Sequence, residues 1–134
     1  FDNNIKVVVV DRDPRDLFFL DKYVWEDGII PNDVEIFCKW FRYTREHRKY
    51  ENMNTDSIKF LRFEDLVYQY DKTTVELREW LGLDEKKHLY KCEYFNPDIS
   101  LHNTQVWKNF SCKDYERSFI EKELSEYLYD FTNI

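Results

Sequence analysis

The sequence has 134 residues, of which 43% are hydrophobic and 19% aromatic, a composition typical of one folded domain. Its net charge of −7 argues against a nucleic-acid partner, because such binding depends on basic side chains that neutralise phosphates. Two glycines are too few for a glycine-rich phosphate loop or a dinucleotide fingerprint. No apolar stretch approaches the ~20 residues of a membrane helix, and no signal peptide precedes the first predicted strand. We therefore expect a cytoplasmic protein without a membrane partner.

A run of valines at Val7–Val10 predicts the first strand, over residues 5–10. The run has no polar alternation, so we expect a strand buried on both faces, as in a parallel sheet covered by helices. Ligands of open α/β sheets gather at the carboxyl ends of the strands. Arg12 follows this strand and is therefore the first candidate for ligand binding.

A helix is predicted directly after the strand, from about Pro14 to Trp25. Asp13 is placed to cap it, and Pro14 would occupy its first position, where the missing N–H is not needed. A helix N-terminus offers N–H groups and a partial positive charge, so Arg12 and this helix start outline an anion site. Alternatively, Arg12 only pairs with the neighbouring aspartates.

The next helix is predicted to begin at Asn32, with Glu35 completing a capping box, and to run to about Lys49. Its apolar face has helical spacing and consists of Phe37, Trp40, Phe41 and Thr44. The cations of the basic segment Arg42–Lys49 lie at the end of this helix, where they complement the negative end of the helix dipole. Alternatively, the segment is a binding patch for an anionic saccharide.

A second strand is predicted over Ser57–Phe63 and should lie parallel to the first, because two helices intervene. Two short helices are expected next, Glu64–Tyr70 and Lys72–Leu81, with Asp65 as a cap at the strand end and Gly82 in the left-handed conformation. The pattern predicts an α/β fold with a parallel sheet flanked by helices.

Ser111 and Asp114 are predicted to start a long C-terminal helix that packs on the sheet. Its apolar face comprises Tyr115, Phe119, Leu124, Tyr127, Leu128 and Phe131. The cysteines have no CxxC spacing, so we expect reduced thiols and neither a disulfide framework nor a zinc site.

Four segments, in order, resemble the sulfotransferase family that uses 3′-phosphoadenylyl sulfate (PAPS). Arg12–Asp16 reads Arg-Asp-Pro-Arg-Asp and matches the family's Arg-Asn/Asp-Pro-Lys/Arg-Asp motif. Ser57–Leu66 is similar to its second strand with the ending Tyr-Glu-Asp-Leu, and Leu77–Leu83 to its Phe-Leu-Gly-Leu helix end. The segment from Phe95 to Asn109 is similar to the late loop that closes over the nucleotide.

The resemblance implies that residues 1–134 are the C-terminal portion of a P-loop NTPase-like sulfotransferase fold. The family's sulfate-binding loop, Lys-Ser/Thr-Gly-Thr/Ser, has no counterpart in the sequence, nor has the region of its general base. The implied function is transfer of a sulfuryl group from PAPS to a hydroxyl or amine acceptor, with a saccharide as one candidate acceptor and without a metal. No catalytic residue is assigned.

The resemblance also implies the residues that bind the nucleotide. Arg12 would bind the 3′-phosphate by a bidentate contact. Phe63 would face the adenine, although an aromatic residue at a strand end is equally suited to the core. In the late loop, phosphate binding would fall on Ser100, on backbone N–H groups or on Lys108, and His102 would contact the nucleotide.

Several residues depart from the family pattern. Asp11 replaces an apolar residue, and Leu20 stands where the family often has a phosphate-binding serine. Ser100-Leu101-His102 replaces Arg-Lys-Gly of the animal cytosolic members, and we expect Trp107 to be a hydrophobic plug of the loop. These departures favour a non-catalytic binding module as the alternative function. A P-loop kinase-like phosphotransferase is a further alternative, because the two families share a sheet topology.

Overall fold

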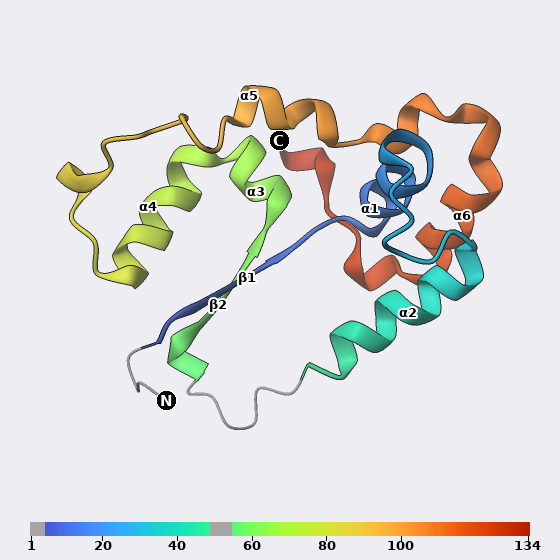
Figure 1. Ribbon diagram of the computed structural model, residues 1–134, viewed down its shortest axis with the longest axis horizontal. Coiled ribbons are helices and arrows are strands. Elements are labelled where there is room, and N and C mark those ends of the chain that lie inside the picture. Colours follow the sequence, from blue (N-terminus) through green and yellow to red (C-terminus); the bar gives the residue numbers. More distant parts are fainter. Residues whose placement is uncertain (1–4, 49–54) are drawn as a thin grey trace. The chain divides into compact units, whose positions relative to one another are not determined.

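The computed structural model describes residues 5–48 and 55–134 and shows a mixed α/β chain (Figure 1). The chain forms two compact units. The first comprises residues 1–11, 50–101 and 132–134, and the second comprises residues 12–49 and 102–131. In the described ranges, no helix combines the length and the hydrophobicity needed to span a bilayer.

The first unit contains two strands that pair in parallel, β1 (Val7–Asp11) and β2 (Ile58–Arg62). They start opposite each other and end opposite each other, at Asp11 and Arg62 (Figure 1). The predicted parallel arrangement of two strands is therefore confirmed, and the bounds of each strand lie within one or two residues of those expected.

The expected burial of the first strand on both faces is wrong. The exposed fractions of Val8 and Val10 are 37% and 52%, and that of Phe60 in β2 is 51%. Within the described residues the sheet consists of these two strands alone, and the exposure of these side chains shows that it is not buried on both faces. The valine run thus reflects the preference of β-branched residues for extended backbone and not the number of buried faces.

Helices α3 (Phe63–Tyr68), α4 (Tyr70–Leu81) and α5 (Pro97–Ser100) complete the first unit together with short 3₁₀ segments at Thr55–Ser57 and Glu85–Lys87. Gly82 ends α4 with φ 72°, as predicted. The expectation that Asp65 caps a helix is wrong, because α3 begins at Phe63 and its N-cap is Arg62. Asp65 lies in the first turn instead, where a carboxylate interacts favourably with the positive end of the helix dipole.

The second unit is built from α1 (Pro14–Leu20), α2 (Val34–Glu46) and α6 (Asp114–Glu123). Helix α1 continues into a π-helical turn at Asp21–Trp25, so the predicted extent of this helix is confirmed. The 3₁₀ segments of this unit are Val106–Asn109, Ser111–Lys113, Ser125–Tyr127 and the part of Leu101–Asn103 that follows Leu101. The buried core consists of Phe18, Phe19, Val34, Phe37, Cys38, Phe41, Ile120 and Leu124.

The structure shows which residue caps the start of α1 and which caps the start of α2. The Asp13 carboxylate accepts the backbone N–H of Arg15 at 2.9 Å, which confirms the predicted cap. Helix α2 is capped by Asp33 and not by Asn32, so no capping box forms. The Oδ1 atom of Asp33 accepts the backbone N–H groups of Glu35 and Ile36 at 3.0 Å each, and Asp33 has the extended backbone conformation of an N-cap.

The predicted long C-terminal helix is shorter than expected. Helix α6 ends at Glu123, a 3₁₀ turn follows, and Leu128 is extended. Ile120 of α6 and Leu124, the C-cap of this helix, belong to the core that they share with α1 and α2. Tyr127 leaves the helical path and contacts the Phe41 ring, 5.5 Å between centroids.

Candidate functional site

Arg12 joins the start of α1 to the late loop. It follows the last residue of β1 and precedes the cap of α1, and its side chain is half-buried. Its Nη2 donates a hydrogen bond to the backbone oxygen of Asn103. Two segments that are 91 residues apart, both singled out by the sequence, therefore meet in the second unit.

Asp13 and Arg15 form a buried ion pair at the same helix start. The Asp13 carboxylate accepts Nε of Arg15 at 3.0 Å and Nη2 at 2.8 Å, and it also accepts the backbone N–H of Tyr129 at 2.9 Å. Nη1 of Arg15 pairs with Glu121 of α6 at 3.0 Å. The Asp13 carboxylate thus accepts one N–H group of this helix start, and the anion site that the sequence outlines around Arg12 stays a prediction.

Asp16 of α1 also binds the late loop, through two backbone N–H groups. Its carboxylate is fully buried and accepts the backbone N–H groups of Gln105 at 2.8 Å and Val106 at 2.7 Å. Burial raises the pKa of the Asp16 carboxyl to about 7; the Gln105 bond opposes this shift and the Asp13 charge adds to it. Three backbone groups of the loop are thus bound at the start of α1, two by Asp16 and one by Arg12.

The remaining side chains of the loop differ in exposure. Trp107 packs against the core, with the guanidinium carbon of Arg15 4.5 Å from its ring centroid, as expected for a plug. His102 is exposed and directly precedes Asn103. Lys108 is exposed and donates to the side-chain oxygen of Gln105. Arg12, His102 and Lys108 therefore all belong to the second unit.

Phe63 and Ser100 belong to the first unit. Phe63 starts α3, and its ring meets that of Phe95 edge to face at 6.1 Å. Phe95 also stacks on Tyr70, with centroids 6.2 Å apart. Ser100 is the last residue of α5. Within the first unit, the structure thus brings Phe63 together with an aromatic cluster that includes Phe95.

Leu20 and Asp16 both lie on α1. Leu20 is 1% exposed and belongs to the core, in agreement with its departure from the family's phosphate-binding serine. The role of Asp16 was missed. The signal was present, because Asp16, Phe19 and Leu20 share one helix face at i, i+3 and i+4, which predicts a buried carboxylate that needs partners.

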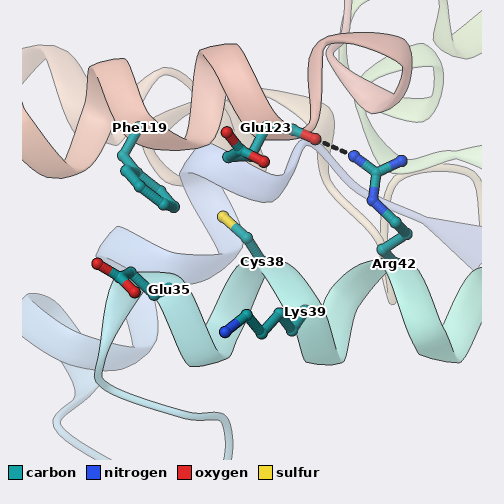
Figure 2. A pocket seen from close by; sticks show the side chains of 6 residues that line it. All are labelled: Glu35, Cys38, Lys39, Arg42, Phe119 and Glu123. Carbon is teal, nitrogen blue, oxygen red and sulfur yellow. Dashed lines mark hydrogen bonds between the residues drawn. The ribbon is translucent and has the colours of Figure 1, made fainter.

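A separate cavity of about 120 Å³ lies between α2 and α6 (Figure 2). It is lined by Glu35, Cys38, Lys39, Arg42, Phe119 and Glu123. Burial, with a further effect of the Glu123 charge, raises the pKa of the Cys38 thiol to about 11, so this sulfur is not a nucleophile at neutral pH. Arg42 donates to the backbone oxygen of Glu123 and pairs with Glu126, which satisfies this cation of the basic segment internally.

Across residues 5–48 and 55–134, no three His, Cys, Asp or Glu side chains are grouped so that they could hold an ion. Comparison with protein-family models, curated proteins and solved structures found no match to this chain.

Proposed function

We propose that this chain is part of a PAPS-dependent sulfotransferase domain, in which Arg12 binds the 3′-phosphate of the nucleotide. One observation carries the proposal. Arg12 donates to Asn103, so the strand-end motif and the late loop, which the resemblance assigns to one nucleotide, meet in the second unit. The parallel strands that precede two of the four motifs also support it.

The chemistry of Arg12 suits this role. A guanidinium is always charged and presents its N–H donors in a planar fork that matches two phosphate oxygens. His102 and Lys108 are exposed on the loop that Arg12 contacts, and both would add donors to a bound phosphate. Ser100 as a phosphate ligand and Phe63 as an adenine contact remain predictions from the resemblance.

The proposed reaction is an in-line displacement at sulfur. The acceptor oxygen or nitrogen forms a bond to sulfur and loses a proton, while the bond from sulfur to the bridging oxygen breaks and leaves adenosine 3′,5′-bisphosphate. Such a reaction depends mainly on positioning and on charge stabilisation of the leaving group. The chain would supply nucleotide binding, and none of its residues is assigned as the general base.

A non-catalytic binding module is the second candidate function. One observation favours it, because Leu20 is buried in the core. A leucine offers no hydroxyl at the position where the family often has a phosphate-binding serine. Such a module would bind the bisphosphate through Arg12 without transferring a sulfuryl group.

Calorimetric titration with adenosine 3′,5′-bisphosphate tests the proposal. We expect Arg12→Ala to weaken binding by about 1.5–3 kcal/mol, the range of a hydrogen bond to a charged group. Arg12→Lys should recover part of this loss, because an ammonium keeps the charge without the planar fork. Arg42→Ala is the matched control, since Arg42 also donates to a distant backbone oxygen in the same unit. Equal affinities of all four proteins, or no binding by the unmodified chain, would contradict the proposal.

A further inference from the structure

The Asp16 carboxyl group is a buried titratable group that nucleotide binding does not explain. It lies on the first turn of α1, is 0% exposed, and receives two backbone N–H groups from a loop 89 and 90 residues further along the chain. Gln105, which gives one of these bonds, has a left-handed backbone with φ 54°. A non-glycine residue keeps that conformation only where its surroundings hold it.

We propose that Asp16 is a positioning residue that latches the segment Asn103–Lys108 to α1, and that this latch opens more readily as the pH rises through neutrality. The latch is supported by the burial of the Asp16 carboxylate and by its two hydrogen bonds to the loop. An effect of the latch on ligand binding rests on the proposed function, because Arg12 contacts the same loop at Asn103.

The direction of the pH effect follows from burial. In the closed loop, loss of water raises the pKa of Asp16 to about 7, although the two N–H groups favour the ionised form. When the loop detaches, water reaches the carboxyl, and its pKa returns toward the usual ~3.9. The closed state therefore binds the proton more tightly than the open state. Closing is favoured at low pH, and the advantage is lost as the pH rises through about 7.

Asp16 lies among charged groups of α1 and of the elements that pack against this helix, which include α6 and the segment Val106–Asn109. The Asp13 charge raises the Asp16 pKa, and the Arg12 charge lowers it. Arg15 is held by Asp13 and Glu121. On the loop side, Lys108 is bound to Gln105.

Amide hydrogen exchange at Gln105 and Val106 between pH 5 and pH 8.5 tests the latch. After correction for the intrinsic exchange rates, we expect protection to fall by up to roughly tenfold per pH unit until about pH 7 and then to level off. In Asp16→Asn, which cannot ionise, this dependence should disappear. Asp33→Asn is the control, because exposed Asp33 also accepts two backbone N–H groups, and it should keep the dependence.

Two results would overturn the latch. One is protection in the unmodified chain that does not change between pH 5 and pH 7, and the other is an unchanged dependence in Asp16→Asn. If that variant fails to fold, the carbon-13 shift of the Asp16 carboxyl in the unmodified chain decides, with a midpoint near 7 expected and one near 4 contradicting the proposal. None of these measurements contains nucleotide, so failure of bisphosphate binding would leave the result for the latch intact.

Discussion

At the scale of single residues, the segment Arg12–Asp16 combines a candidate ligand contact with packing. Arg12 is half-buried at the end of a strand, whereas Asp13, Arg15 and Asp16 are buried. Their carboxylates and guanidinium satisfy one another or bind backbone groups of segments far away in the sequence. Charged residues in such a motif therefore contribute to stability as well as to any binding, and mutagenesis must separate the two.

Asp13 provides the stability test at this scale. We expect Asp13→Ala to lower the free energy of unfolding by about 3–5 kcal/mol, because it leaves the buried Arg15 guanidinium without its main partner. Asp33→Ala, which removes an exposed helix cap, should cost only about 1 kcal/mol. Urea denaturation followed by circular dichroism measures both. Similar losses for the two variants would mean that the buried pair is no more important than a surface cap.

At the scale of elements, the chemistry of neighbouring residues predicted the positions of helices and strands better than it predicted which of their faces are buried. The Asp13-Pro14 start, the Gly82 end and the parallel strands follow from rules that involve a few neighbouring residues or the order of elements. The burial of Val8 depends on layers that the sequence pattern cannot count.

The capping of α2 and the end of α6 show a second limit of the same kind. Asn32 and Asp33 are both good caps, so residue type alone does not decide between them, and the structure uses Asp33. The apolar spacing after Glu123 continues in the sequence, but the helix ends there and Tyr127 contacts Phe41 of α2. Periodicity alone therefore does not predict the end of this helix. The meeting of Arg12 with the late loop was expected only from the family resemblance.

Gly82 gives the prediction for elements. Its φ of 72° lies in the left-handed region, and a Cβ added there would meet no atom within 4 Å, so the cost of substitution comes from the backbone alone. We expect Gly82→Ala to destabilise the protein by about 1 kcal/mol. Gly82→Asn should cost less, because asparagine tolerates this conformation. Thermal and urea unfolding measure the difference, and a Gly82→Ala variant as stable as the unmodified chain would contradict the role of Gly82 as a helix end.

At the scale of the whole molecule, the resemblance covers both units but supplies only part of the groups that sulfuryl transfer requires. The sequence contains no Lys-Ser/Thr-Gly-Thr/Ser segment that would bind the transferred sulfate group. We therefore expect the purified 134-residue chain to release no adenosine 3′,5′-bisphosphate from PAPS above the rate without protein. Chromatographic detection of the nucleotide checks this, with heat-denatured chain as the control. Turnover abolished by Arg12→Ala would show instead that the chain carries its own catalytic groups.

The interleaving of the two units has a consequence for how the protein is made. The second unit combines residues 12–49 with residues 102–131, while residues 50–101 belong to the first. A ribosome therefore releases α1 and α2 well before α6, with the aromatic face of Phe18, Phe37 and Phe41 still lacking Ile120 and Leu124. Strands β1 and β2, by contrast, are both available once residue 62 has emerged. Synthesis from the N-terminus thus exposes the α1–α2 face for the longest time, and this is the surface that a nascent-chain chaperone would need to shield.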